Sequence, residues 1–351
     1  MESVPVRATH NNNFNFLRLL FASLVLVSHA PELRDGDRHR ELLSRLGGIS
    51  FGELAVQGFF LLSGYLIVSS WWRKPQLKPY FESRIRRIVP GFWVAFVLSV
   101  VVVGVLSTHQ ATASYFASLD YLALTKEALR LQPPEAPHVF DGQPYPVLNG
   151  ALYTIAYEFR CYILVALLGL VGLRSQKYIW LTLLLASLGL LYFSPHLENL
   201  AFPGRLYLFI DVPTFVRLLT FFAAGATFHL FRPWLVLDWK LAALAGVLVL
   251  VFLLELPQFT NFALATAGAY ALFWFAFADL PLLDRFKHWA DASYGLYLYG
   301  WPIQKLLNWY FPNVSPWVLL LVAVPICVAL GLTSWYLVES RFLKRKQPRP
   351  A

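Results

Sequence analysis

The stretch FNFLRLLFASLVLVSHA, residues 14–30, decides the fold, because it is long and apolar enough for a membrane helix yet contains Arg18 and His29. Ionisable side chains are costly in hydrocarbon, so their presence indicates a functional site by default. Eleven residues along a helix return to nearly the same face after a rise of about 16 Å. Arg18 and His29 are therefore expected at two depths on one buried stripe. The alternative is that Arg18 snorkels to one interface while His29 caps the helix at the other.

Similar apolar runs recur from end to end of the chain. Of its 351 residues, 58% are hydrophobic and only 14% are charged, and the mean hydropathy is +0.54. This composition excludes a soluble globular domain and indicates an all-α, polytopic membrane protein. We expect about ten transmembrane helices in a single membrane domain, 1–351, with no appended soluble domain. The predicted helices cover 14–31, 51–72, 88–106, 150–173, 178–193, 214–231, 241–256, 259–278, 293–311 and 316–338.

The distribution of positive charge predicts the orientation. Most of the 29 Lys and Arg lie on one side of this layout, above all in 73–87 and in the tail 341–349. The positive-inside rule then places both termini in the cytoplasm. It also explains most of the net charge of +9, so nucleic-acid binding is not expected. The first apolar run lacks a cleavage pattern and should be retained as a helix. Cys161 and Cys327, in separate predicted helices, indicate neither a disulfide nor a metal site.

The second apolar run, GELAVQGFFLLSGYLIVSSWW from Gly52, indicates a helix that packs closely against its neighbours. Gly58 and Gly64 allow another backbone to approach, and Ser63 can hydrogen-bond across a helix interface. Packing alone would account for all three residues.

An arginine cluster follows in YFESRIRRIVP, from Tyr80. Arg84 and Arg87 are three residues apart and share one face of a helix. The fixed fork of donors on a guanidinium suits it to phosphate groups. The cluster, which includes Arg86, is thus a candidate phosphate site, although an orientation signal of the positive-inside kind explains it equally well.

The fourth predicted helix, NGALYTIAYEFRCYIL from Asn149, has a carboxylate about nine residues into the membrane. Thr154, Glu158 and Tyr162 are spaced by four and form one polar stripe. A carboxylate at this depth should be protonated, paired or exposed to a wet cavity. Its candidate partners on other helices are His29, Arg18 and Arg217, the last of which also lies close enough to a helix end to snorkel.

The ninth predicted helix opens with DASYGLYLYGWPIQK, from Asp291. Tyr294, Tyr297, Trp301 and Gln304 recur every three or four residues and form an aromatic and polar stripe that Pro302 interrupts. An aromatic belt at the membrane interface explains the first tyrosines but not the deeper glutamine.

The longest connection between predicted helices covers 107–149 and is expected outside the membrane. Its segment LQPPEAPHVFDGQPYPVLNG, from Leu131, contains five prolines, which preclude a continuous helix. The connection could form a lid, bind an acceptor or serve as a plain solvated connector. A further alternative places a membrane-embedded or re-entrant piece at 115–131.

Taken in order, these segments resemble the acyltransferase 3 family, whose members acylate cell-envelope polysaccharides and related glycans. The resemblance spans nearly the whole chain. It rests on Arg18 and His29 with ten residues between them, and on GFFLLSGYLI, RIRRIVP, LYTIAYEFRCY, DASYGLYLYGWPIQ and YLVESRF. It implies ten membrane helices in a bacterial inner (plasma) membrane and transfer from cytoplasmic acyl-CoA, most often acetyl-CoA, to a sugar hydroxyl. The expected partners are acyl-CoA as co-substrate, a glycan or lipid-linked sugar as acceptor, and membrane lipids, with no bound cofactor or metal.

The resemblance, together with the residue patterns, assigns roles. His29 is expected to act as general base or transient acyl carrier, Arg18 to steer the coenzyme or stabilise charge at the thioester, and Glu158 to orient His29. The candidate coenzyme-binding residues are Arg84, Arg86 and Arg87. The candidate substrate-binding residues are Tyr157, Tyr294, Tyr297 and Gln304.

Two positions depart from the family pattern. Tyr153 stands where many members have tryptophan, and Gly300 stands where many have histidine, so no role of that histidine carries over.

Two other classes of protein remain as alternatives to the enzyme. Buried charges and a proline-broken helix also suit a lipid-linked glycan flippase or an ion-coupled transporter, although no paired broken helices occur in the two halves. An assembly protein without turnover would use its ionisable residues for packing only.

Overall fold

The computed structural model describes residues 12–37, 40–170, 176–197, 211–288 and 290–343, and in these ranges the chain is helical and has no strand. The predicted all-α class is therefore confirmed. Eight helices in the described ranges are long and apolar enough to cross a membrane. They cover 14–35, 51–73, 77–106, 150–170, 176–193, 212–234, 257–277 and 316–342.

The other two predicted spans are also helical but less clearly membrane-spanning. One is 17 residues long, Trp239–Glu255. The other, Ser293–Tyr310, is 18 residues long and buries the polar Gln304, Lys305 and Asn308. The count of ten spans remains a prediction. The cytoplasmic placement of both termini also remains a prediction. Residues 1–11 and 344–351 lie outside the described residues, and so do residues 171–173 of the fourth predicted span.

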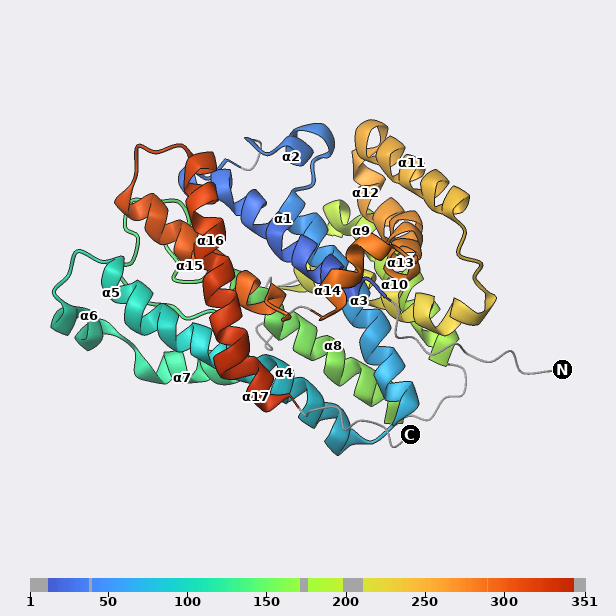
Figure 1. Cartoon of the computed structure of the whole chain (residues 1–351), viewed down its shortest axis with the longest axis horizontal. Coiled ribbons are helices and arrows are strands. Elements are labelled where there is room, and N and C mark those ends of the chain that lie inside the picture. The colour runs from blue at the N-terminus through green and yellow to red at the C-terminus, as the bar shows by residue number, and fades with distance from the viewer. Residues whose placement is uncertain (1–11, 38–39, 171–175, 198–210, 289, 344–351) are drawn as a thin grey trace.

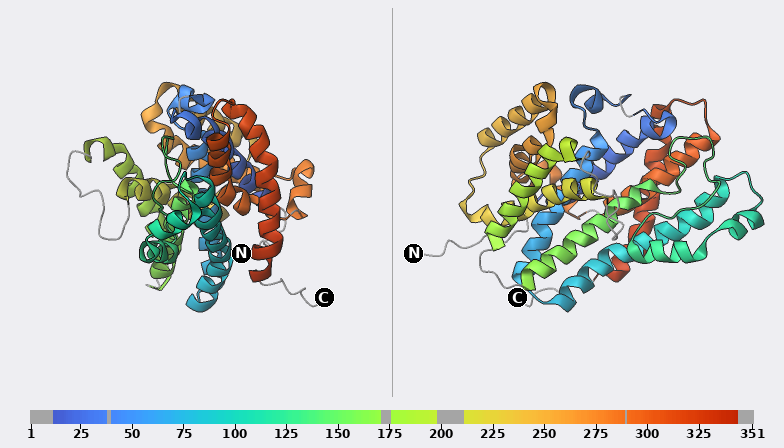
Figure 2. Two further views of the ribbon diagram at one scale, coloured as in Figure 1. Left: turned by 90° about the vertical axis from the view of Figure 1, so that its left-hand side faces the viewer. Right: turned by 180° about the vertical axis from the view of Figure 1, so that it is seen from behind.

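The long helices cross one another in one bundle, with α11 at one edge and α4, α6 and α7 at the opposite edge (Figures 1 and 2). In chain order the α-helices are α1 (Phe14–Asp35), α2 (Leu42–Gly47), α3 (Phe51–Arg73), α4 (Leu77–Leu98), α5 (Gly104–Leu106), α6 (Thr112–Ser118), α7 (Tyr121–Arg130), α8 (Tyr153–Leu170), α9 (Gln176–Leu197), α10 (Val212–Phe231), α11 (Trp239–Glu255), α12 (Thr260–Ala263), α13 (Ala269–Phe277), α14 (Asp284–His288), α15 (Ser293–Tyr310), α16 (Pro316–Ser334) and α17 (Ser340–Phe342).

The centre of the bundle is α3, which packs against α10 on one side and α1 on the other. Its glycines allow this. A Cβ at Gly64 would lie 2.0 Å from the carbonyl oxygen of Phe222 in α10, and one at Gly225 would lie 2.0 Å from that of Leu61. A Cβ at Gly58 would meet the Phe21 ring of α1. The close approach predicted from the second apolar run is thus present, and it involves backbone directly.

The third span begins earlier than predicted. The helix α4 starts at Leu77 and continues through a π-helical segment, Ser99–Val103, to Leu106. The arginine cluster was expected in a connection because charges usually mark helix ends. Instead it lies within the first turns of α4, so the orientation of each arginine is fixed by the helix.

The segment after α4 folds back along it, and whether it enters the membrane, as in the re-entrant alternative, remains a prediction. The hydroxyl of Tyr115 in α6 donates to the Val100 carbonyl at 2.8 Å, and Trp93 Nε1 donates to the Ala128 carbonyl of α7 at 3.3 Å. The chain then returns to the end of α4, where the Phe140 amide donates to the Ser107 carbonyl at 2.8 Å. This part of the long connection is packed against the bundle.

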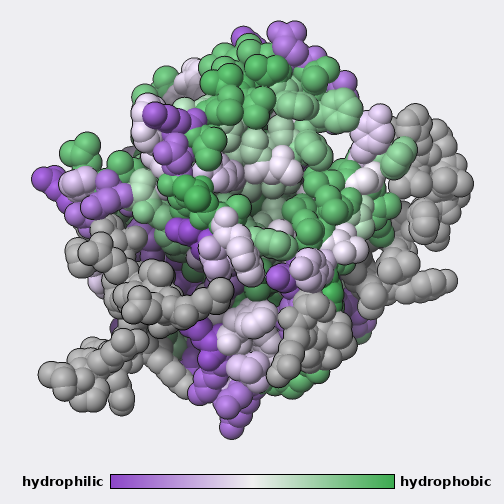
Figure 3. Space-filling model, turned by 90° about the vertical axis from the view of Figure 1, so that its right-hand side faces the viewer, coloured by the Kyte–Doolittle hydropathy of each residue, from purple (hydrophilic) through white to green (hydrophobic). Residues whose placement is uncertain are grey.

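The molecule presents apolar side chains outward, as a protein in lipid must. Figure 3 shows one face on which hydrophobic residues cover much of the surface, while hydrophilic ones gather toward its margins. On α11 and α16 the exposed apolar residues include Leu244, Val247, Val251, Leu321 and Val322. A soluble protein rarely exposes so much contiguous apolar area, so the surface itself indicates a membrane setting.

Candidate functional site: two polar cavities

Two polar cavities lie at opposite ends of α1 and α3. The His29 cavity has a volume of about 220 Å³ and the Glu158 cavity one of about 640 Å³. Residues that line the His29 cavity include Ser28, His29, Glu32, Glu53, Gln57, Tyr145, Arg217 and Trp301. Residues that line the Glu158 cavity include Arg18, Ser63, Arg73, Arg84, Arg87, Thr154, Glu158, Tyr162 and Tyr294. Arg18 and His29 therefore lie at the two depths that their spacing predicts, one in each cavity.

The imidazole of His29 stands edge-on to the Trp301 indole, with ring centroids 4.9 Å apart. Trp301 can take this position because residue 150 has no side chain, since a Cβ at Gly150 would lie 2.6 Å from its ring. Pro31 lies within α1, two residues beyond His29, and cannot donate to the helix ladder there. His29 thus lies in the last turns of α1, beside an aromatic ring of α15.

An ion pair closes one side of the His29 cavity. Arg217 Nη1 lies 2.8 Å from Glu53 Oε1, and both side chains are about three-quarters buried. The other oxygen of Glu53 accepts from the Ser50 amide at 3.0 Å, as part of a capping box at the start of α3. Arg217 was considered as a partner of Glu158 or as a snorkelling residue. The structure places it against Glu53 instead.

A buried carboxylate that the sequence reasoning missed holds the residue before His29. Glu41, 1% exposed, accepts from the Ser28 hydroxyl at 2.7 Å and from the Phe51 amide. Its burial raises the pKa of the Glu41 carboxyl, while the bonds from Phe51 and Ser28 act in the opposite direction. Glu41 lies in a short polar connection, where a carboxylate gives no sequence signal. It ties the end of α1 to the start of α3.

The proline-rich segment forms a wall of the His29 cavity. Lys305 of α15, fully buried, donates to Gln143 Oε1 at 3.0 Å and to the Pro144 carbonyl at 2.7 Å. Its ammonium also lies 4.8 Å from the centre of the Phe140 ring. Tyr145, which lines the cavity, has a φ of +52°, an uncommon conformation for a side-chain-bearing residue. Such backbone conformations persist where the surroundings enforce them, often at functional sites.

In the Glu158 cavity, one carboxylate oxygen joins α8 to α3. Glu158 Oε1 accepts from the Ser63 hydroxyl of α3 at 2.7 Å and from the Tyr162 hydroxyl, one turn on, at 2.6 Å. The polar stripe predicted for α8 is therefore real. The expected contact with His29 is absent: both described partners of this carboxylate lie in the Glu158 cavity, and His29 lines the other one. The sequence could not reveal this, because it does not show which helices are neighbours.

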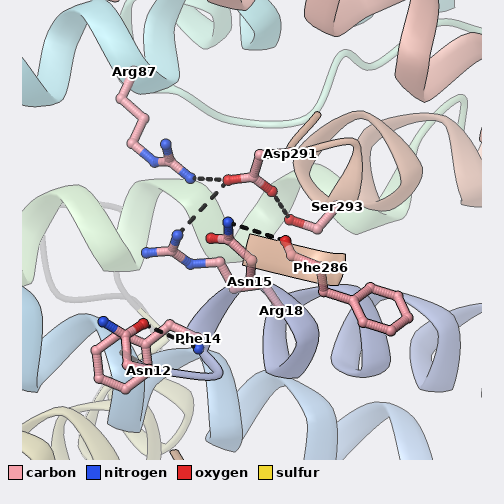
Figure 4. Close-up of polar contacts among 8 residues, drawn as sticks. All are labelled: Asn12, Phe14, Asn15, Arg18, Arg87, Phe286, Asp291 and Ser293. Carbon is pink, nitrogen blue, oxygen red and sulfur yellow. Dashed lines mark hydrogen bonds and ion pairs between the residues drawn. The ribbon is translucent and has the colours of Figure 1, made fainter. Parts of the chain in front are cut away.

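Two arginines converge on one further carboxylate that was given no role from the sequence. Asp291 Oδ2 lies 2.7 Å from Arg87 Nη2 and 3.7 Å from Arg18 Nη1, and Asp291 Oδ1 accepts from the Ser293 hydroxyl (Figure 4). Beside them, Asn15 Nδ2 donates to the Phe286 carbonyl at 3.5 Å. Asp291 lies two residues before the start of α15. Its place beside a predicted span was the feature from which the sequence could have indicated a role. It fixes α1, α4 and α15 to one another at the Glu158 cavity.

The three clustered arginines have different surroundings. Arg84, 7% exposed, stacks over the Tyr80 ring at 4.1 Å and donates to the Tyr80 carbonyl at 3.0 Å. Its buried Nε has no hydrogen-bond partner in the part of the chain that the structure describes. Arg87 also lines the Glu158 cavity, whereas Arg86 pairs at the surface with Glu82 at 2.8 Å and lines neither cavity.

The four candidate substrate-binding residues also separate. Tyr294 lines the Glu158 cavity and donates to the Ile88 carbonyl at 2.9 Å, and Tyr297 lines both cavities. The Tyr157 hydroxyl accepts from the Asp211 amide at 3.2 Å, and its ring stacks on Phe215. Gln304 is 3% exposed within α15. Neither Tyr157 nor Gln304 lines either cavity. The buried Nε2 of Gln304 has no hydrogen-bond partner among the described residues.

These features define the class: a helical membrane protein with a cationic cavity at one end of its central helices and a histidine-containing, carboxylate-rich cavity at the other. The chain belongs to the acyltransferase 3 family, because the profile described as "Acyltransferase domain" matches residues 11–338. It is therefore a membrane acyltransferase, which argues against the transporter and assembly alternatives.

Two characterised proteins are similar over nearly their whole length. An "O-acetyl transferase" of Shigella phage Sf6 is 30% identical over 355 residues, which cover 97% of this chain and 98% of the relative. "Nodulation protein 10" of Rhizobium leguminosarum bv. viciae is 25% identical over 362 residues, with 95% and 94% covered. No solved structure matches the chain.

Proposed function

We propose that the protein transfers an acyl group, acetyl in the first instance, from cytoplasmic acyl-CoA to a sugar hydroxyl of an envelope polysaccharide or glycolipid in a bacterial inner membrane. The observation that carries the proposal is the pairing of an arginine-lined cavity with a histidine-containing cavity at opposite ends of the same two helices. The name of the phage relative supports O-acetyl transfer.

The Glu158 cavity is the proposed donor site. Arg73, Arg84 and Arg87 line it, and guanidinium groups suit the phosphates of a coenzyme. The buried, unpartnered Nε of Arg84 is a donor that such a ligand would satisfy. Arg18 lines the same cavity and is placed to steer the coenzyme. The positive-inside rule puts this end of the bundle in the cytoplasm, where acyl-CoA is available.

The His29 cavity is the proposed acceptor site. Carboxylates, an amide and Arg217 supply donors and acceptors for hydroxyl groups, while Trp301 and Tyr145 present aromatic rings. Polar groups set among aromatic rings are suited to a sugar, whose faces are apolar and whose edges are polar.

In the proposed reaction His29 removes the proton from the acceptor hydroxyl as its oxygen attacks the thioester carbonyl carbon. The new carbon–oxygen bond replaces the carbon–sulfur bond, and the imidazolium returns the proton to the departing thiolate. Glu32 lines the same cavity one turn beyond His29, so its carboxylate is placed to orient the imidazole. Glu32 thus takes the supporting role that the sequence reasoning gave to Glu158.

The test is acetyl-CoA turnover by the purified protein in lipid, followed as thiol release and as acylation of an added glycan. The His29→Gln protein should lose about 100-fold or more in kcat with unchanged acetyl-CoA affinity. Arg84→Gln and Arg87→Gln should each weaken that affinity by about tenfold.

Arg86→Gln is the matched control, because it removes the same charge from the same helix at a site outside both cavities. If His29→Gln retains wild-type turnover, or if Arg86→Gln weakens acetyl-CoA binding as much as Arg84→Gln does, the proposed site is wrong.

A further inference from the structure

The two cavities meet at only two of the residues that line them, Val56 of α3 and Tyr297 of α15. Every other lining residue in the described chain belongs to one cavity or the other. A donor bound at the arginines and an acceptor bound at His29 are therefore on opposite sides of this pair of side chains.

The hydroxyl of Tyr297 contacts one residue from the wall of each cavity. It donates to the Ala151 carbonyl at 2.8 Å and lies 2.6 Å from Thr154 Oγ1, which is then its donor. Ala151 lines the His29 cavity and Thr154 lines the Glu158 cavity. The ring packs edge-on to Phe59 of α3, with centroids 5.9 Å apart. The side chain thus spans from α15 to α8 and contacts α3 on the way.

We infer that Tyr297 and Val56 form a movable seal between the donor and acceptor cavities, which opens only to admit the acyl end of the bound donor. This inference rests on the proposed function for the identity of what passes. The seal itself is a physical barrier: Tyr297 acts as a positioning residue that keeps solvent and acceptor away from the thioester until the acyl group enters the His29 cavity.

The chemistry explains why a seal is needed. When the acyl group reaches the acceptor, the acceptor oxygen bonds to the acyl carbon, the carbon–sulfur bond breaks and the hydroxyl proton passes through His29 to sulfur. If water takes the place of the acceptor, the same bonds change and the products are a free carboxylic acid and the CoA thiol. An open passage would favour this loss, and it would also connect the two faces of the membrane.

The first experiment measures the barrier without any catalysis. Val25 lines the His29 cavity and is close in size to cysteine, while the native Cys161 and Cys327 are fully buried. The Val25→Cys protein in sealed vesicles of known orientation would be treated with a small, membrane-impermeant methanethiosulfonate. Labelling should occur from one face only. With Tyr297→Ala added, labelling should occur from both faces, and the protein with only native cysteines should stay unlabelled.

Tyr299→Ala is the matched control, since Tyr299 lies two residues away in α15 and contacts Ser334 rather than either cavity. It should leave labelling one-sided. The inference would be wrong if labelling occurred from both faces with Tyr297 intact. It would also be wrong if labelling stayed one-sided in the Tyr297→Ala protein. If the Tyr297→Ala protein does not fold, Val56→Ala opens the same division from α3 and gives the same two outcomes.

The second experiment measures coupling as the ratio of acyl-CoA hydrolysis to acyl transfer. Tyr297→Phe keeps the ring and removes both hydroxyl contacts, so the ratio should rise several-fold. An unchanged ratio in both Tyr297→Phe and Tyr297→Ala would contradict the seal. If the wild-type protein transferred an acyl group from no donor, the proposed function would be contradicted instead. The labelling experiment would still show whether Tyr297 and Val56 separate the two cavities.

Discussion

At the scale of single residues, charge type alone does not show which ionisable side chain belongs to a site. Arg84, Arg86 and Arg87 follow one another closely, yet two line a cavity and one faces the surface. Arg86 was grouped with the other two as a coenzyme-binding residue from the sequence, although residues three apart share a helical face and the residue between them does not. The partners of the arginines were not predictable in the same way, since Asp291 is remote in sequence.

Asp291 offers a direct comparison between a buried and an exposed ion pair. Asp291→Asn leaves Arg18 and Arg87 without their carboxylate, and should lower the free energy of unfolding by about 2 kcal/mol. Glu82→Gln, which breaks the surface pair with Arg86, should lower it by less than about 1 kcal/mol. Thermal unfolding in detergent measures both proteins. Equal shifts in the two variants would show that the convergence on Asp291 does not stabilise the bundle.

Gly150 is where a single methyl group should disturb the proposed acceptor site. An added Cβ would lie 2.6 Å from the Trp301 ring, so Gly150→Ala should displace that ring from His29. We expect kcat to fall by about tenfold or more, because small displacements of positioning groups are costly. Gly246→Ala, where a Cβ meets nothing within 4 Å, should have wild-type kinetics. A fully active Gly150→Ala enzyme would exclude a positioning role for Trp301.

At the scale of elements, apolar periodicity predicted most helices but not their ends or their accessory segments. The start of α4 at Leu77 was not predicted, because its first turns carry charged residues and therefore resemble a connection in sequence. In the structure, some of these charges line the Glu158 cavity. The segment 107–149 was open to several interpretations, since prolines exclude a helix without indicating a location. Its place was decided by contacts remote in sequence, above all with Lys305 of α15.

Lys305 should therefore control the order of the cavity wall. Lys305→Met keeps the aliphatic length but loses the bonds to Gln143 and Pro144, so backbone amides of 138–147 should exchange hydrogen faster in mass spectrometry. The KM for the acceptor should rise while acetyl-CoA affinity stays the same. Lys126→Met, on the exposed face of α7, is the control. Unchanged exchange in 138–147 would show that the wall is held by other contacts.

At the scale of the whole molecule, the sequence predicted the class, the family resemblance and the two depths of Arg18 and His29, but not which helices are neighbours. The expected link between Glu158 and His29 failed for this reason. Neighbours are set by features such as the Gly64 and Gly225 contacts, whose partners no periodicity identifies. The presence of two cavities, with different chemistry at each end of α3, follows only from the assembled bundle.

The predicted orientation has a simple test at this scale. Asp37 follows α1 and Lys74 follows α3, so the two residues should lie on opposite sides of the membrane. In intact cells, an impermeant thiol reagent should label Asp37→Cys and should reach Lys74→Cys only after the membrane is opened. The reverse pattern would invert the orientation and would place the proposed donor site outside the cytoplasm.

The backbone contact between α3 and α10 makes these two helices a rigid unit within the bundle. No side chain lies between Gly64 and Phe222 or between Gly225 and Leu61, so the pair has little freedom to slide. Because α3 supplies residues to both cavities, we expect any working motion in the other elements that line them, such as α15, which supplies Tyr297. Spin labels on α3 and α10 should keep one separation with and without acyl-CoA, while a label on α15 marks the moving part.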